Sequence, residues 1–207
     1  MTTGGYAVAV PTRIAGVLLA AGEGSRLGAP KALVELGGRT LAERGVAMLQ
    51  AGGTDPVLIV TGAVQVQVDG ARVVPNPDWR TGMGTSVRAA LASLGPAGLD
   101  EVDAVVIALA DQPLVGAESV RRLIAAHRGG ASVAVAVYAG QQRNPVLIAR
   151  EHWAAVAEAA IGDRGARAFL RARPELITAV ECGDTGSPDD IDTPDDLARI
   201  RIRINLG

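Results

Sequence analysis

Short, uniformly apolar runs alternate with amphipathic segments along most of this chain, and the alternation limits the folds that it can adopt. The runs are rich in β-branched residues and span residues 14–21, 56–60, 71–74, 104–110, 132–138, 145–148 and 177–181. Segments with the spacing and flanking residues of helices lie near 40–51, 84–94, 117–128, 151–160, 164–172 and 194–200. Strands this apolar suit burial on both faces. The alternation therefore predicts an α/β fold with a mainly parallel sheet and helices on both faces.

The chain is expected to form one domain. Its 207 residues suffice for a sizeable core, and we find no internal repeat, low-complexity tract or linker. We expect residues 1–12 to be a flexible leader and residues 13–207 to be the domain. The strictly alternating stretch at 199–205 predicts either a short edge strand or the end of a helix.

Composition excludes several functional classes. Aromatic residues make up 2% of the chain and the formal net charge is -2, so neither base stacking nor an electrostatic nucleic-acid surface is expected. One cysteine and two histidines cannot form a Cys/His zinc site, an iron–sulfur cluster or an internal disulfide. Because no stretch approaches about 18 consecutive apolar residues and no export signal is evident, we expect no membrane partner and a cytoplasmic location.

The first candidate motif is the glycine-rich stretch LAAGEGSRLGAPK at residues 19–31. Ligands in parallel sheets lie beyond the carboxyl ends of strands, and this loop directly follows the first apolar run. Glycines bring backbone N–H groups close to an anion, and Arg26 and Lys31 add positive charge. Lys31 is the only lysine among 20 basic residues, which indicates either a need for a compact ammonium or chance in an arginine-rich sequence. The spacing G-x-G-x-x-x-G matches neither a dinucleotide fingerprint nor a P-loop.

Two acidic stretches follow later in the chain. Asp111 in ALADQP ends an apolar strand, where a carboxylate must be solvated, paired or bound to a metal, and it suits Mg²⁺ beside nucleotide phosphates. A cap of the turn before Pro113 is the alternative. In DDIDTPDDL, Thr193 and Pro194 predict the start of a helix. Asp192 precedes that start and is a second candidate metal ligand, although a solvated acidic loop also accounts for it.

Two further motifs lie between the predicted strands and helices. The loop PNPDWRTGMGTSVR at residues 75–88 leads into a helix that Thr85 or Ser86 is expected to cap. It is a candidate contact for a base or an anion, and a plain transition from loop to helix is the equal alternative. In GDRGAR, Arg164 and Arg167 are three residues apart, which predicts a shared helical face suited to an anionic acceptor. A surface pair with Asp163 is the alternative.

In this order and at these separations, LAAGEGSRLGAPK, ALADQP and DIDTPDDL resemble the MobA-like nucleotidyltransferases, from about residue 14 to 200. The resemblance implies a single-domain, Rossmann-like three-layer sandwich. GMGTSVRA, GDRGARAFL and LAAG look most similar to the molybdenum cofactor cytidylyltransferases within that family. This subgroup is also similar to nicotine blue oxidoreductase, an NAD(P)H-dependent enzyme.

The resemblance implies Mg²⁺-dependent transfer of CMP from CTP to the phosphate of a molybdopterin-type acceptor, with a molybdoenzyme as a further partner. Catalysis would fall to Arg26, Lys31 and Asp111, with Asp111 and Asp192 as metal ligands. The expected nucleotide contacts are Leu19, Ala20, Ala21, Gly22, Gly24, Arg26, Lys31, Asn76, Gly84 and Ser86.

The expected acceptor contacts are Asn144, Arg164 and Arg167. The cytidylyltransferases commonly have Gly-His-Pro where this chain has Arg143, Asn144 and Pro145, a departure that affects the acceptor rather than the transfer. Two alternatives stay open: an NAD(P)H-dependent oxidoreductase on the same fold, and a non-catalytic chaperone that binds the molybdenum cofactor.

Overall fold

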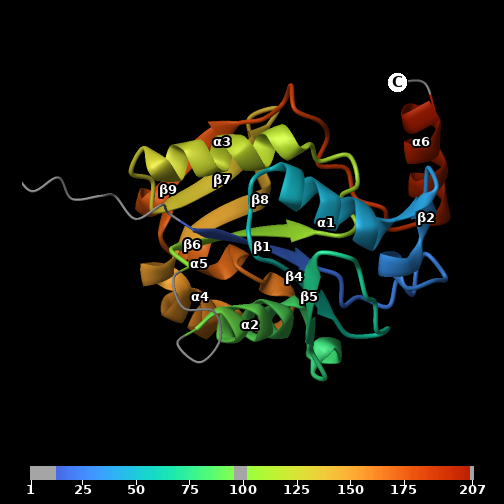
Figure 1. The fold of residues 1–207 in the computed structure, drawn as a ribbon, viewed down its shortest axis with the longest axis horizontal. Helices are drawn as coiled ribbons and strands as arrows, with labels where there is room; N and C mark the ends of the chain where they lie inside the picture. Colours follow the sequence, from blue (N-terminus) through green and yellow to red (C-terminus); the bar gives the residue numbers. More distant parts are fainter. Residues whose placement is uncertain (1–12, 96–101, 206–207) are drawn as a thin grey trace, which may run out of the picture.

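The computed structural model describes residues 13–95 and 102–205, so the predicted leader lies outside the described residues. The centre is a seven-stranded sheet of order β5-β4-β1-β6-β8-β7-β9 (Figure 1). Its strands are β1 (Ile14–Leu19), β4 (Val57–Thr61), β5 (Ala71–Pro75), β6 (Ala104–Leu109), β7 (Val133–Tyr138), β8 (Gln141–Ala149) and β9 (Ile177–Glu181). Every neighbouring pair is parallel except the two that involve β8. The prediction of a mainly parallel sheet is confirmed.

Helices cover both faces of the sheet, as predicted. Helices α1 (Leu41–Ala51) and α3 (Ala117–Arg128) lie on one face, and α2 (Met83–Leu94), α4 (Trp153–Ala159) and α5 (Arg167–Ala172) lie on the other (Figure 1). No helix in residues 13–95 and 102–205 is long and apolar enough to cross a membrane.

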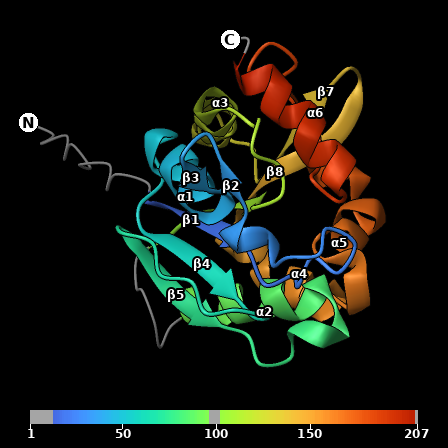
Figure 2. The same ribbon diagram turned by 90° about the vertical axis from the view of Figure 1, so that its right-hand side faces the viewer.

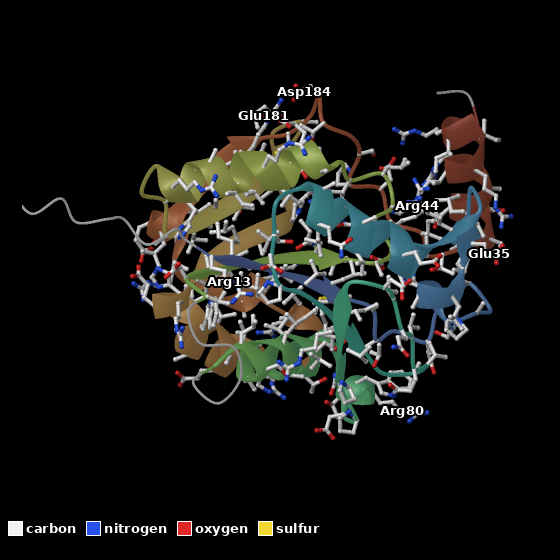
Figure 3. The ribbon with its side chains drawn as sticks, viewed as in Figure 1. Arg13, Glu35, Arg44, Arg80, Glu181 and Asp184 are labelled. Carbon is white, nitrogen blue, oxygen red and sulfur yellow. The ribbon has the colours of Figure 1, made fainter. Side chains whose placement is uncertain are left out.

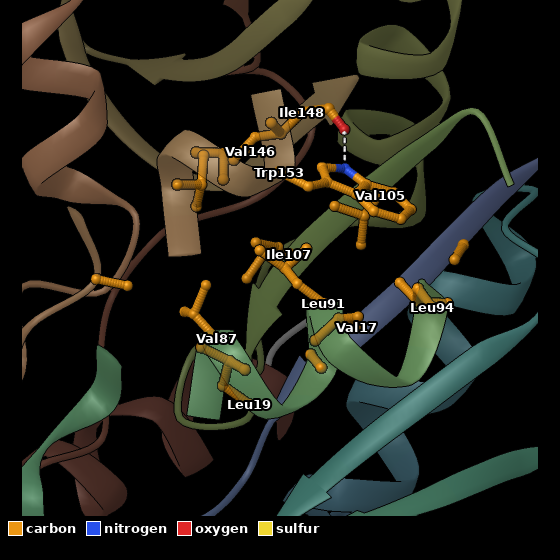
Figure 4. Packing of buried hydrophobic residues seen from close by; sticks show 14 of the residues in the cluster. Val17, Leu19, Val87, Leu91, Leu94, Val105, Ile107, Val146, Ile148 and Trp153 are labelled. Carbon is orange, nitrogen blue, oxygen red and sulfur yellow. Dashed lines mark hydrogen bonds between the residues drawn. The ribbon is translucent and has the colours of Figure 1, made fainter. Parts of the chain in front are cut away.

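Alternate residues of each central strand supply two separate hydrophobic cores. Val17 and Leu19 of β1 pack with α2, α4 and α5, whereas Leu18 packs with α1 and α3. Figure 4 shows the first core, in which the indole Nε1 of Trp153 donates a hydrogen bond to the Ile148 carbonyl at 3.1 Å. Because both faces of the strand are buried, no polar residue interrupts it, which explains its uniformly apolar sequence.

A third, smaller core holds the last helix, α6 (Pro194–Asn205), against a hairpin of β2 (Glu35–Leu36) and β3 (Arg39–Thr40). Figure 2 shows α6 crossing in front of the end of the sheet. Val34, Leu36 and Leu41 pack there with Ile191 and Ile200. The alternating stretch at 199–205 is therefore a helix end, not an edge strand.

One predicted helix is shorter than expected. The segment expected at 164–172 begins as a 3₁₀ turn at Gly162–Arg164, and α5 starts only at Arg167. Gly165 lies between the two with a positive φ of 51°, a conformation that interrupts an α-helix. Arg164 and Arg167 thus do not share a helical face, and that prediction was wrong.

Candidate active site

A cavity of about 310 Å³ opens beyond the carboxyl ends of β1 and β6. Seven of the residues predicted to act at the site line it: Leu19, Ala20, Ala21, Gly22, Lys31, Ser86 and Asp111. Residues that the sequence grouped at this edge of the sheet therefore line one cavity, in the position where ligands of parallel sheets commonly bind.

The glycine loop shapes one wall of this cavity. Leu27 and Gly28 both donate backbone hydrogen bonds to the Gly24 carbonyl, closing a tight turn. Gly24 has a φ of 65°, and a Cβ there would lie 2.0 Å from the Ala29 carbonyl oxygen. Only glycine fits this position, so the turn that returns the chain to Lys31 depends on it.

Lys31 links two carboxylates that are far apart in the sequence. Its Nζ lies 2.7 Å from Asp111 Oδ2 and 2.5 Å from Asp192 Oδ1. The Lys31 and Asp111 side chains are mostly buried, with 19% and 22% of their surfaces exposed. An ammonium has three donors, so one hydrogen of Lys31 stays available for a ligand in the cavity.

A backbone contact brings the two carboxylates together. The Ile191 N–H donates to the Asp111 carbonyl at 2.8 Å, and Ile191 itself is fully buried. Thr193 caps α6 as predicted: its Oγ1 accepts from Asp196 N–H, and its own N–H donates to Asp196 Oδ2. These hydrogen bonds hold the acidic segment beside the end of β6.

Arg26 completes the charged cluster. Its guanidinium lies 3.1 Å from Asp192 Oδ2, the carboxylate oxygen that Lys31 does not contact. The hydrogen bond from Lys31, together with the charges of Lys31 and Arg26, lowers the pKa of Asp192. Burial disfavours the charged form of Lys31, but the nearby Asp111 and Asp192 carboxylates outweigh it and raise the pKa of Lys31. Both groups are therefore charged at neutral pH.

Asp111 has the free oxygen that a divalent cation would need. Its Oδ1 is buried and has no hydrogen-bond partner among the described residues. No group of three His, Cys, Asp or Glu side chains is arranged to hold a metal in that part of the chain. Mg²⁺ usually takes one or two carboxylates together with waters and substrate phosphates. The donor set fits a cation that binds together with a nucleotide.

The wall opposite the glycine loop comes from α2 and the loop before it. The buried Asn76 donates to Thr85 Oγ1 at 2.8 Å and to Ser86 Oγ at 2.9 Å. These hydroxyls lie inside the first turn of α2, whose N-cap is Gly82 without a side-chain hydrogen bond, so the prediction that Thr85 or Ser86 caps the helix was wrong. Of these three side chains, only Ser86 lines the cavity, and Asn76 supports the wall from behind.

Gly84 has a packing role. A Cβ at this position would lie 2.3 Å from the Ala160 carbonyl oxygen. Only glycine at position 84 therefore allows α2 to approach the segment after α4 this closely. This contact places Asp163 at the cavity wall.

Seven cavity residues were not among the predicted site residues: Trp79, Arg80, Gly82, Met83, Leu109, Ala110 and Asp163. The Arg80 guanidinium stacks over the Trp79 ring at 4.4 Å, and Figure 3 shows Arg80 on the outer side of this loop. The sequence did point to the region of Trp79 and Arg80, because both belong to the loop at residues 75–88 that is a candidate contact for a base or an anion.

The predicted acceptor residues lie next to this cavity. Asn144, Arg164 and Arg167 line a small hollow of about 30 Å³ that shares Leu19 and Leu109 with it. Asn144 comes from β8, Arg164 from the 3₁₀ turn and Arg167 from α5.

Together, the fold and the site define a nucleotide-utilising α/β enzyme of the nucleotidyltransferase class. A family model described as the MobA-like NTP transferase domain matches residues 16–177, and the chain belongs to this family.

Two curated relatives show different activities within this group. The chain is 36% identical to nicotine blue oxidoreductase of Paenarthrobacter nicotinovorans, over 90% of this chain and 96% of the relative. It is 40% identical to a probable molybdenum cofactor guanylyltransferase of Opitutus terrae, over 41% of this chain and 43% of the relative.

Crystal structures of similar proteins share the fold. An Rv0371c homolog from Mycobacterium sp. strain JC1 superposes with a TM-score of 0.82 at 32% identity, covering 94% of this chain and 98% of that chain. Rv0371c of Mycobacterium tuberculosis H37Rv in complex with manganese superposes with a TM-score of 0.76 at 27% identity, covering 93% and 100%. A divalent cation is thus bound by a protein with this fold.

Proposed function

We propose that this protein transfers CMP from CTP to the phosphate of a molybdopterin-type acceptor in a Mg²⁺-dependent reaction that releases pyrophosphate. The observation that carries the proposal is the Lys31 ammonium in the cavity, held between Asp111 and Asp192 with Arg26 beside them. Membership of the MobA-like family supports the transfer. The LAAG sequence of the loop supports CTP, and the guanylyltransferase relative supports the acceptor class.

The reaction needs positioning and charge neutralisation rather than a covalent intermediate. A phosphate oxygen of the acceptor attacks the α-phosphorus of the nucleotide, and the bond to the β-phosphate oxygen breaks as pyrophosphate leaves. Lys31 and Arg26 would exchange their contacts with Asp192 for contacts with the triphosphate, neutralising the charge on the leaving group. Asp111, with Asp192, would hold Mg²⁺, which neutralises further phosphate charge.

Lys31→Ala should slow the transfer by roughly 10²- to 10³-fold, as does the loss of one preorganised donor to a developing negative charge. Pyrophosphate release measured with CTP and acceptor tests this expectation. Activity within about tenfold of wild type would contradict the role given to Lys31.

Asp111→Ala should abolish the dependence on Mg²⁺ while the protein stays folded. Thermal shift with CTP, GTP, UTP, ATP, NADH and NADPH, each with and without Mg²⁺, tests this. A saturating ligand at about 100 times its dissociation constant adds about 2.7 kcal/mol, which is easily detected as a higher melting temperature. Stabilisation of wild type by CTP with Mg²⁺, lost in Asp111→Ala, is the expected result. A variant that cannot fold would instead indicate a structural role for Asp111.

A second candidate is an NAD(P)H-dependent oxidoreductase, favoured by the 36% identity to nicotine blue oxidoreductase over nearly its whole length. In that case NADH or NADPH alone would stabilise the protein, and a quinonoid substrate would consume the NAD(P)H absorbance. The glycine spacing of the loop does not match a dinucleotide fingerprint, so transfer remains our proposal.

A further inference from the structure

A second cavity, of about 260 Å³, lies between β8 and α5. Its apolar lining comes from the sheet and α5 and includes Val135, Val146 and Leu170. Ligand pockets commonly measure about 300 to 1,000 Å³, so this one suits a small ring system rather than a whole dinucleotide.

Three exposed arginines stand around the apolar lining: Arg143 on β8, and Arg167 and Arg171 on α5. None of the three forms an ion pair with a carboxylate among the residues that the structure describes. The adjacent Arg173, by contrast, is paired with Glu175 at 2.6 Å. Three positive charges close together without paired carboxylates favour the binding of an anionic ligand. Guanidinium groups are suited to carboxylate or phosphate oxygens, to which they donate paired hydrogen bonds.

A narrow hollow lies between this cavity and the active-site cavity. It shares Leu19, Met83 and Leu109 with the active-site cavity, and Asn144 and Arg167 with the second cavity. Figure 4 shows three of its apolar residues, Val87, Ile107 and Val146, in the core beside α2. Residues 163–171 follow the same route, from Asp163 at the first cavity to Arg171 at the second.

We propose that the cavity between β8 and α5 binds the faces of a flat heteroaromatic ring of the acceptor together with an anionic group on that ring, separate from the phosphate that reacts near Lys31. Arg143 and Arg171 hold the anion, and Val135 and Leu170 contact the ring. That this ligand is the acceptor rests on the proposed transferase function. The affinity of the cavity for an aromatic anion follows from its own residues.

Pterin-6-carboxylate, a fluorescent flat ring with one carboxylate, is a direct probe, and 6-hydroxymethylpterin is its neutral counterpart. Fluorescence titration of the full chain should show at least about tenfold tighter binding of the carboxylate, because charge-assisted hydrogen bonds are stronger than neutral ones. The double variant Arg143→Gln, Arg171→Gln should lose this preference. Arg128→Gln, which removes an exposed arginine at the end of α3 on the opposite face, should retain it.

Equal binding of the two pterins by wild type, or an unchanged preference in the double variant, would overturn the proposal. Displacement of the carboxylate by CTP alone would also overturn it, since it would place the probe in the active-site cavity. The double variant should keep the stabilisation by CTP with Mg²⁺. Charge-selective probe binding in a protein that shows no CMP transfer would support the anion site and overturn only its assignment to an acceptor.

Discussion

Lys31 satisfies two carboxylates at once because an ammonium is compact and can donate in several directions. An arginine in its place would present a planar fork better suited to one carboxylate. Asp111 and Asp192 would otherwise be two partly buried negative charges close together, an unfavourable arrangement. The cluster therefore stabilises the ligand-free site and also keeps there the charges that our proposed transfer reaction requires.

The Asp192 ion pairs make a pH-dependent contribution to stability. The folded state lowers the pKa of Asp192, mainly through the hydrogen bond from Lys31. The stabilisation is therefore complete above the unfolded-state pKa of about 3.9. It disappears as the pH falls through the lower pKa of the folded state. Asp192→Asn should therefore be less stable than wild type at pH 7, by about 1 kcal/mol at most, since the Asp192 side chain is 34% exposed and water screens the pairs.

Urea midpoints of both proteins between pH 7 and pH 3 measure this difference, which should narrow only below about pH 4. Asp69→Asn, at an exposed position, is the matched control and should show no such difference. A difference in urea midpoint between wild type and Asp192→Asn that does not change with pH would show that the Asp192 side chain acts by packing alone.

At the scale of elements, the site residues lie at the carboxyl ends of the strands. Glycines determine how closely the segments that form the cavity walls pack against one another. The start of α2 and the segment after α4 meet at Gly84 and Gly82, where a Cβ would lie 2.3 Å and 2.4 Å from backbone atoms of Ala160 and Gly162. Backbone cannot move away as a flexible side chain can. These two contacts therefore define the width of the cavity on the side of Asp163.

Gly84→Ala should destabilise the fold by about 1–3 kcal/mol, as overpacking of a close contact does. Gly22→Ala is the informative comparison, because a Cβ at Gly22 meets nothing within 4 Å. It should leave the melting temperature unchanged yet weaken stabilisation by CTP with Mg²⁺, because the methyl group stands where the loop must approach phosphate. If Gly22→Ala keeps the full CTP response, the glycine loop does not contact the triphosphate.

For the whole molecule, the site lies where the small third core joins the sheet. The two large cores hold the helices on the sheet, whereas Ile191 and Ile200 fix α6 and thereby Asp192. Loss of packing in the third core should thus affect ligand binding more than a comparable loss within a sheet-covering layer.

Ile200→Ala and Leu123→Ala remove fully buried side chains from the third core and from the α1/α3 layer, respectively. Each should cost about 2–5 kcal/mol in the free energy of unfolding. At a temperature where both variants are folded, only Ile200→Ala should bind CTP with Mg²⁺ more weakly by calorimetry. Equal weakening in both variants would mean that α6 does not position the site.

The sequence alone determined the sheet and its covering helices, and its resemblance to a known family grouped Lys31 with Asp111 and Asp192. Burial of both strand faces leaves a pattern of apolar residues that can be read locally, and the motifs mark the loops after the strands. Only the tertiary structure decided the late start of α5, the Gly82 cap of α2 and the second, arginine-lined cavity. These depend on contacts between distant segments, such as the close approach of Gly82 and Gly84 to the segment after α4, and local sequence patterns do not encode such contacts.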